Sequence, residues 1–191
     1  MALPLLFRIR AWGVEHVPPT GGALLASNHQ SFLDPTLVGT PLGRQVYYMA
    51  RRSLFEVPGL GAYLRSLKAF PVERGGVDRR ALRQAVTLMR AGQALVVFPE
   101  GTRSPGGGVQ RFRAGFALLA AQAGVPIVPV AIDGAFEAWP RHRAFPWFGR
   151  VRVAYGEALP PLGEGKDERR QAAAEVRRRV VALQEQLRAT R

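Results

Sequence analysis

Short apolar runs alternate with amphipathic or glycine-broken stretches along nearly the whole chain, and this alternation limits the fold more than any other feature. The apolar runs predict strands at 7–14, 23–27, 46–50, 69–72, 94–98, 125–132 and 150–155. The intervening and final stretches predict a helix that begins near Ser31 and Asp34 and further helices over 78–90, 112–123 and 166–191. The stretch 52–67 is also helical in pattern, but Pro58, Gly59 and Gly61 break it. Such units favour an α/β fold, with a mainly parallel (mixed) sheet flanked by helices and a ligand site beyond the carboxyl ends of the strands.

The longest stretch without charge, 114–132, is long enough to pass a simple search for membrane-spanning helices. However, Gly124, Pro126 and Pro129 interrupt it, and its first half is alanine-rich whereas its second half is β-branched. A buried helix followed by a buried strand is the better interpretation. We therefore predict no spanning segment, and any membrane contact is expected to be peripheral.

The charge of the chain predicts an anionic partner. There are 27 basic against 14 acidic residues, a net charge of +13, and all the basic residues except Lys68 and Lys166 are arginine. Lipid headgroups, a polyphosphate cofactor, an acidic carrier protein and nucleic acid all suit that charge, while a GC-rich genome explains the arginine bias equally well. The absence of cysteine excludes disulfides, thiolate metal sites and a cysteine nucleophile.

A candidate base follows the strand predicted at 23–27. His29 lies five residues before Asp34, and a strand-to-helix turn between them would bring imidazole and carboxylate together. A neutral imidazole can accept a proton near neutral pH, and a carboxylate fixes its tautomer and stabilises the imidazolium that forms. The spacing alone decides little, because a histidine in a capped turn beside an aspartate fits it equally well.

Two further polar clusters lie at predicted strand ends and suit a phosphate monoester. After the strand at 94–98, a glycine-rich loop offers a carboxylate, backbone N–H groups, a hydroxyl and a guanidinium from Glu100, Gly101, Thr102 and Arg103. Arg74 follows the strand at 69–72 and adds a second guanidinium. Each loop alone fits an ordinary solvated turn, but together with His29 they describe a site that holds a phosphate and deprotonates a nearby hydroxyl.

These residues resemble the 1-acylglycerol-3-phosphate acyltransferases, or lysophosphatidic acid acyltransferases, of the glycerolipid acyltransferase superfamily. His29 and Asp34 match the HX4D motif of that family, and Arg74 matches the arginine that closes its second motif. The stretch 98–104 matches the third motif, and Val-Pro-Ile-Val-Pro-Val at 125–130 matches the proline-bearing fourth.

The resemblance implies one acyltransferase domain over 1–191, with a motif-bearing core at about 13–156 and a terminal amphipathic helix at about 166–190. It implies transfer of a fatty acyl group from acyl-CoA or acyl carrier protein to the free hydroxyl of 1-acylglycerol 3-phosphate, which gives phosphatidic acid. Glycerol 3-phosphate and other lysolipids are alternative acceptors. No bound cofactor and no metal are expected.

The resemblance also assigns roles to individual residues. His29 and Asp34 become the expected catalytic pair, in which the histidine deprotonates the acceptor hydroxyl. The expected phosphate-binding residues are Arg51, Arg74, Glu100, Gly101, Thr102 and Arg103. Arg51 stands where members often have lysine, which makes its assignment the weakest of the set. Backbone N–H groups near Ser31 are candidates for stabilising the oxyanion.

We expect the chain to lie at the cytoplasmic face of a membrane as a peripheral protein. A segment with aromatic residues among arginines suits the headgroup layer, although a core-packed hairpin fits it equally well. Its aromatic residues are Phe136, Trp139, Phe145, Trp147 and Phe148. The same composition and the sequence pI of 11.5 support a nucleic-acid-binding protein as a hypothesis from another class. A catalytically silent lipid-binding relative is a third hypothesis, which the intact His29 and Asp34 disfavour.

Overall fold

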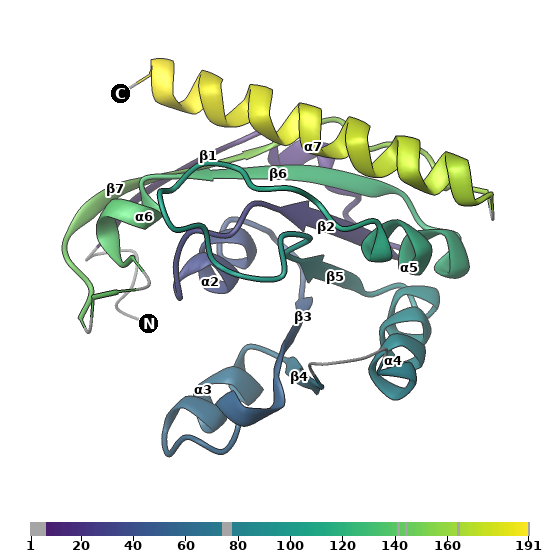
Figure 1. Ribbon diagram of the computed structural model, residues 1–191, viewed down its shortest axis with the longest axis horizontal. Coiled ribbons are helices and arrows are strands. Elements are labelled where there is room, and N and C mark those ends of the chain that lie inside the picture. Colours follow the sequence, from purple (N-terminus) through teal and green to yellow (C-terminus); the bar gives the residue numbers. More distant parts are fainter. Residues whose placement is uncertain (1–6, 74–77, 141, 144, 164, 191) are drawn as a thin grey trace.

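The computed structural model describes residues 7–73, 78–140, 142–143, 145–163 and 165–190. These residues form a sheet of seven strands in the order β1-β7-β6-β2-β5-β3-β4 (Figure 1). The strands are β1 (Phe7–Trp12), β2 (Ala23–Ser27), β3 (Val46–Arg51), β4 (Ala69–Val72), β5 (Ala94–Val97), β6 (Ile127–Asp133) and β7 (Gly149–Tyr155). All neighbouring strands run parallel except β6 and β7, which are antiparallel. The predicted α/β fold with a mainly parallel, mixed sheet is confirmed.

Helices cover both faces of this sheet. They are α2 (Asp34–Gly39), α3 (Leu60–Ser66), α4 (Arg79–Arg90), α5 (Gly115–Ala123), α6 (Ala135–Ala138) and α7 (Lys166–Ala189), with short 3₁₀ helices η1 (Val14–His16) and η2 (Arg52–Leu54). One face packs against α4, α5 and α7, and the other against α2 and α6 (Figure 1). Among the described residues, no helix combines the length and the apolar character needed to cross a membrane.

The central strands are apolar on both sides because both of their faces are covered. All five side chains of β2 are buried, and they alternate between the two cores: Leu24 faces α5 and α7, whereas Leu25 faces α2 and α6. Strands β5 and β6 are buried over their whole length in the same way. This explains why the sequence shows continuous apolar runs at these strands instead of an alternating pattern.

Helix α4 begins and ends at the residues that local chemistry favours. The carboxylate of Asp78 accepts hydrogen bonds from the backbone N–H groups of Arg80 and Ala81, which caps the first turn. Gly92, which lies just beyond the helix, adopts the left-handed conformation with φ of 80°. The intervening apolar residues at helical spacing, Ala81, Ala85 and Met89, are buried against the sheet.

The structure corrects several predicted helix boundaries. The break predicted within 52–67 is confirmed, because the stretch divides into η2 and α3 and Gly59 between them has φ of 77°, but Gly61 does not interrupt α3. The helix predicted from Phe112 begins only at Gly115, and Phe112 is instead buried in the segment before it. The short helices η1 and α6 were not predicted, since neither has enough residues for a periodic pattern.

The strand directions bring the candidate residues to one edge of the sheet. The carboxyl ends of β2 to β6 all point to the same edge, because these five strands are mutually parallel. Strand β7 runs opposite to β6, and β1 runs parallel to β7, so the amino ends of β1 and β7 also lie at this edge. The segments that follow β2 and β5 therefore meet there.

Candidate active site

His29 and Asp34 lie in contact beyond the carboxyl end of β2. The imidazole Nδ1 of His29 is 2.7 Å from Oδ2 of Asp34. Asp34 begins α2 and is completely buried, whereas the side chain of His29 retains 20% exposure. Pro35 in the first turn requires no N–H partner, which suits this tight entry into the helix. The predicted pair is thus brought together with its histidine accessible to a substrate.

The carboxylate of Asp34 also fixes the backbone of the loop. Its Oδ2 accepts hydrogen bonds from the backbone N–H groups of Gln30, at 2.5 Å, and Ser31, at 2.7 Å. Because Oδ2 is the acceptor in all three contacts, the hydrogen to His29 belongs on Nδ1, which leaves Nε2 as the basic nitrogen. The N–H groups of Gln30 and Ser31 are occupied in this way. These two N–H groups are therefore not free to stabilise the oxyanion, which corrects the prediction for Gln30 and Ser31.

Neighbouring side chains hold the loop and the ring of His29. The ring of Phe98 stacks on the imidazole with a centroid distance of 4.2 Å and an interplanar angle of 21°. The amide of Asn28 pairs with the backbone of Ile132 in β6, donating to its C=O at 2.9 Å and accepting from its N–H at 2.7 Å. These buried bonds fix the end of β2 against β6, one residue before His29.

A buried polar network connects this loop with helix α7. Side-chain amides of Gln30 and Gln184 both donate to the C=O of Gly107, at 2.5 and 2.9 Å. Arg188 donates to the same carbonyl at 3.2 Å and to Asp133 at 3.1 Å. The terminal helix therefore connects to the loop of His29 through the carbonyl of Gly107, which binds the buried Gln184 and the more exposed Arg188.

Glu100 lies beneath the backbone of His29. Its Oε1 accepts a hydrogen bond from the N–H of His29 at 3.3 Å, and in the same loop the N–H of Ser104 donates to the C=O of His29 at 2.7 Å. Glu100 is only 5% exposed, and burial raises its pKa to about 7, although the backbone N–H groups of Gln110 and His29 oppose the shift. The structure thus places Glu100 against the backbone of His29, in the dyad of His29 and Asp34, and not at the surface of the loop.

Arg103 lies over the ring of Phe32, which is one of the residues between His29 and Asp34. Its guanidinium carbon is 3.4 Å from the ring centroid, a cation–π contact that joins the third motif to the first. Gly101 and Thr102 precede it as exposed residues of the same loop, and Gly101 adopts φ of 72°, which favours glycine. Three of the predicted phosphate ligands therefore lie in one loop beside the dyad.

Arg51 is not brought together with these residues by any contact among the described residues. It is the exposed last residue of β3, and strand β5 lies between β3 and β2. Its neighbour Arg52 instead pairs with Glu73. Arg74 lies outside the described residues, so its assignment stays a prediction.

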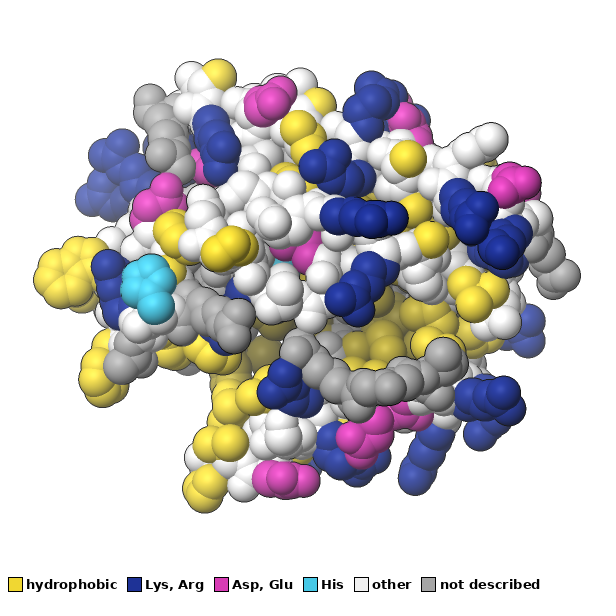
Figure 2. Space-filling model, viewed as in Figure 1, with side chains coloured by type: hydrophobic (Ala, Val, Ile, Leu, Met, Phe, Trp, Pro, Cys, Tyr) yellow, Lys and Arg dark blue, Asp and Glu magenta, His cyan; other side chains and the backbone are white. Residues whose placement is uncertain are grey.

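Part of the aromatic segment before β7 is exposed. Phe145 is 78% exposed, and Trp147 and Phe148 are each 68% exposed, whereas Phe136 and Trp139 are half-buried. Hydrophobic side chains correspondingly project at the left-hand edge of the molecule, the side on which Figure 1 places β7 and α6 (Figure 2). A hairpin packed wholly into the core does not describe this segment.

Comparison with known proteins identifies the family. The model of the family described as Acyltransferase matches residues 8–133, about two thirds of the chain. The chain belongs to the acyltransferase family. The loop from His29 to Asp34 and the loop of Glu100 both lie inside the matched region.

Named relatives and a solved structure agree with this family. A 1-acyl-sn-glycerol-3-phosphate acyltransferase of Bacillus subtilis is 26% identical over 79% of this chain and 73% of its own length. A chloroplast protein of that name from Arabidopsis thaliana is 32% identical over 70% of this chain, but the chain spans only 38% of its length. The crystal structure of the 1-acyl-sn-glycerophosphate acyltransferase of Thermotoga maritima superposes with a TM-score of 0.78 and 31% identity, covering 95% of this chain and 72% of that one.

Several residues that build this site are not predicted from the sequence. Asn28, Gln30 and Phe32 lie within or beside the HX4D motif, but only the fold shows what they contact. Gln184 had a detectable signal, because this polar residue follows Val176 and Val180 on the apolar side of the terminal helix. A polar residue on the buried side of a helix indicates a specific partner.

Glu100 gives the stability of the acyltransferase a characteristic pH dependence. A carboxyl group whose pKa rises from 4.5 in the unfolded chain to about 7 in the folded protein favours folding less as pH rises through that window. Relative to Glu100→Gln, the native chain should lose at most a few kcal/mol of unfolding free energy between about pH 5 and about pH 8. Urea denaturation of both proteins at the two pH values measures this difference, and a constant difference would contradict the assignment.

Proposed function

We propose that this acyltransferase moves a fatty acyl group from an acyl thioester to the free hydroxyl of 1-acylglycerol 3-phosphate, giving phosphatidic acid. The observation that carries the proposal is the three-donor contact of Asp34 Oδ2, which orients His29 with Nε2 as a base. The names of the relatives, as 1-acyl-sn-glycerol-3-phosphate acyltransferases, support this choice of acceptor. An assay that compares lysophosphatidic acid, glycerol 3-phosphate and lysophosphatidylcholine as acceptors tests the proposal.

The chemistry follows from the dyad. Nε2 of His29 removes the proton of the acceptor hydroxyl as its oxygen attacks the thioester carbonyl, and the buried Asp34 carboxylate stabilises the imidazolium. The tetrahedral intermediate then expels the thiolate, which takes the proton from the imidazolium. A thiol has a pKa near 8.5, so the thiolate leaves without a strong general acid. One base therefore serves both steps.

The loop after β5 is the proposed phosphate-binding element. Arg103 is positioned by its contact with Phe32, between the two dyad residues in sequence, so a phosphate bound there lies beside the base. The backbone of Gly101 and the hydroxyl of Thr102 are exposed in the same loop and add donors. We assign Glu100 to positioning this loop against His29, since its carboxylate contacts the His29 backbone.

The donor and the membrane belong to the same proposal. Acyl-CoA and acyl carrier protein are both strongly anionic and suit a chain of net charge +13. The exposed Phe145, Trp147 and Phe148 support peripheral attachment at the cytoplasmic face of a membrane, where the lysolipid acceptor resides. The earlier hypothesis of nucleic-acid binding rested on charge and aromatic composition alone, which these partners account for.

Replacing His29 by alanine should remove the base without unfolding the chain. We expect kcat to fall by about 10³-fold or more, with the circular dichroism spectrum and lysolipid binding retained. The matched control is His142→Ala, which removes an exposed histidine outside the dyad and should leave kcat within about twofold. Near-native turnover in His29→Ala would reject the proposed mechanism.

Replacing Arg103 by alanine should act on the acceptor phosphate. Loss of a charge-assisted contact raises KM for lysophosphatidic acid by roughly 10- to 100-fold with a smaller effect on kcat. Steady-state assays in neutral detergent micelles should compare lysophosphatidic acid, glycerol 3-phosphate and lysophosphatidylcholine, with Arg83→Ala, on the distant helix α4, as the control. Preference of the native chain for lysophosphatidylcholine, or an unchanged KM in Arg103→Ala, would reject the phosphate assignment.

A further inference from the structure

Four arginines of the neighbouring strands β1 and β7 form a cleft outside the dyad. Arg8 is in register with Arg150, and Arg10 with Arg152. The residues that alternate with them, Ile9, Ala11, Val151 and Val153, belong to the core on the side of α2 and α6. All four arginine side chains therefore lie on the opposite face, the face of α7, where with Thr190 they line a cavity of about 170 Å³.

Most of this positive charge is not neutralised by the described residues. Arg152 lies 3.8 Å from Asp133, whose other oxygen accepts from Arg188. Arg8, Arg10 and Arg150 are exposed, and no described carboxylate pairs with them. Like charges directly opposite one another on neighbouring strands destabilise a sheet, and an anion held between them relieves that repulsion.

The surroundings of the cleft indicate where such an anion resides. The exposed Phe145, Trp147 and Phe148 immediately precede β7, and the rings of Trp147 and Phe148 are in edge contact at 6.4 Å. Aromatic rings beside arginines are typical of protein surfaces that enter the headgroup layer of a bilayer. The three rings belong to the segment that connects α6 to β7, two elements that Figure 1 shows on the side of the molecule away from α4.

We propose that the cleft of Arg8, Arg10, Arg150 and Arg152 binds the phosphate group of an anionic membrane phospholipid. Guanidinium groups bind phosphate oxygens in pairs, and a cavity of 170 Å³ suits a headgroup phosphate better than a whole nucleotide cofactor. The inference rests on the proposed function for its membrane setting. It adds a second phosphate site, which strand β6 separates from the strand that precedes the dyad.

The cleft opens at the same edge of the sheet as His29. Arg152 of β7 is in register with Asp133 at the carboxyl end of β6, and Ser27 at the carboxyl end of β2 is in register with Val130 of β6. Arg152 and the loop that follows Ser27 therefore lie at the same edge of the sheet. A phospholipid phosphate in the cleft would hold the active-site edge against the bilayer that carries the lysolipid. The arginines thus orient the enzyme, while the dyad performs the transfer.

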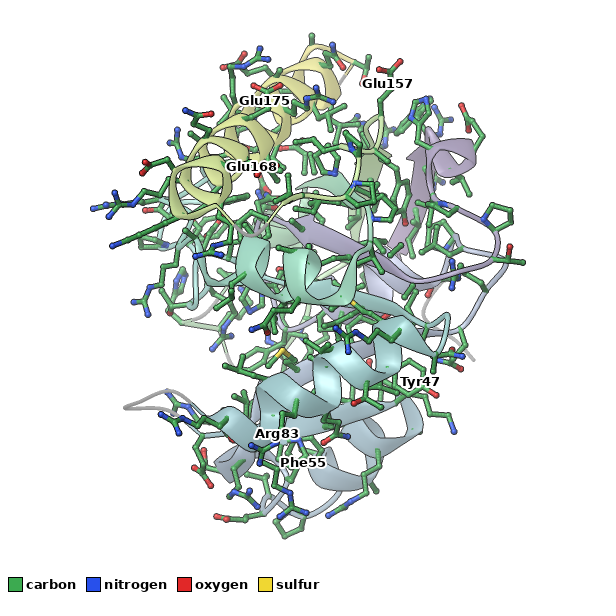
Figure 3. All side chains as sticks on the ribbon, turned by 90° about the vertical axis from the view of Figure 1, so that its right-hand side faces the viewer. Tyr47, Phe55, Arg83, Glu157, Glu168 and Glu175 are labelled. Carbon is green, nitrogen blue, oxygen red and sulfur yellow. The ribbon has the colours of Figure 1, made fainter. Side chains whose placement is uncertain are left out.

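The test compares vesicle binding by the native chain of 191 residues and by two charge-matched variants. One variant is Arg8→Gln with Arg150→Gln, in the cleft, and the control is Arg79→Gln with Arg83→Gln, on the exposed side of α4. Figure 3 shows Arg83 on the part of the molecule opposite α7, which carries Glu168 and Glu175. Circular dichroism confirms the fold of each variant before binding is measured.

Sedimentation with vesicles of phosphatidylcholine and phosphatidylglycerol should show a loss of about 30-fold in the partition coefficient of the cleft variant. The control should lose less than about threefold, and neither should differ on vesicles of phosphatidylcholine alone. Equal losses in both variants, or an unchanged cleft variant, would overturn the proposal. So would an unchanged vesicle affinity accompanied by weaker binding of an acidic carrier protein.

Inorganic phosphate distinguishes a lipid site from a site for the free ion. A titration followed by the arginine Nε–H signals of the native chain should need millimolar phosphate, whereas vesicle binding survives in phosphate of that concentration. Displacement from vesicles by micromolar phosphate would show a free-ion site and overturn the lipid assignment. Acyl transfer by the native chain is measured separately, in neutral micelles. A chain that is active but does not prefer anionic vesicles rejects only the lipid-binding cleft. A chain that prefers anionic vesicles but is inactive rejects only the proposed function.

Discussion

The organisation of the active site depends on one buried oxygen atom, Oδ2 of Asp34. It accepts hydrogen bonds from the imidazole of His29 and from the backbone N–H groups of Gln30 and Ser31. Hydrogen-bond donors offset the cost of burying a carboxylate, and here the donors to Oδ2 belong to the loop that the carboxylate shapes. The same atom therefore closes the turn between β2 and α2 and selects the tautomer of His29, the proposed base.

The rest of the fold supplies rigidity to this turn from three directions. Asn28 attaches the end of β2 to β6, and Glu100 supports the backbone of His29 from the loop after β5. Gln184 reaches the same region from α7, a helix more than a hundred residues later in the chain. The bonds of Asn28 and Gln184 are buried and that of Glu100 is partly buried, so they restrict the loop more than exposed contacts would.

The sequence predicted the fold class well, because long periodic or continuous apolar segments reflect burial directly. Strand β2 and strand β4 have the predicted bounds, and α4 begins after Asp78 as its capping chemistry indicates. The contacts of Gln30, Phe32 and Gln184 were not predictable, since they depend on which loops the strand order brings together. The break in the helical stretch over 52–67 was predicted from Pro58, Gly59 and Gly61, and the stretch does divide at Gly59, although Gly61 lies inside α3.

In the candidate site, too, local sequence patterns predicted some residues, whereas long-range contacts were not predictable. Residue types and spacing indicated His29 and Asp34, whereas only the fold shows that Glu100 lies beneath the dyad and that Arg103 lies on Phe32. The cleft of β1 and β7 was equally invisible, because its arginines are more than a hundred residues apart in the chain and meet only through the register of the two strands. Long-range register is the information that a single sequence lacks.

The tautomer of His29 tests the central claim most directly. Long-range ¹H–¹⁵N correlation spectra of ¹⁵N-histidine-labelled protein, assigned with His29→Ala, report which ring nitrogen carries the hydrogen in the neutral imidazole. If Asp34 orients a base, the neutral ring carries its hydrogen on Nδ1, with Nε2 unprotonated. A neutral ring with its hydrogen on Nε2 would contradict this account, because no basic nitrogen would then face the acceptor hydroxyl.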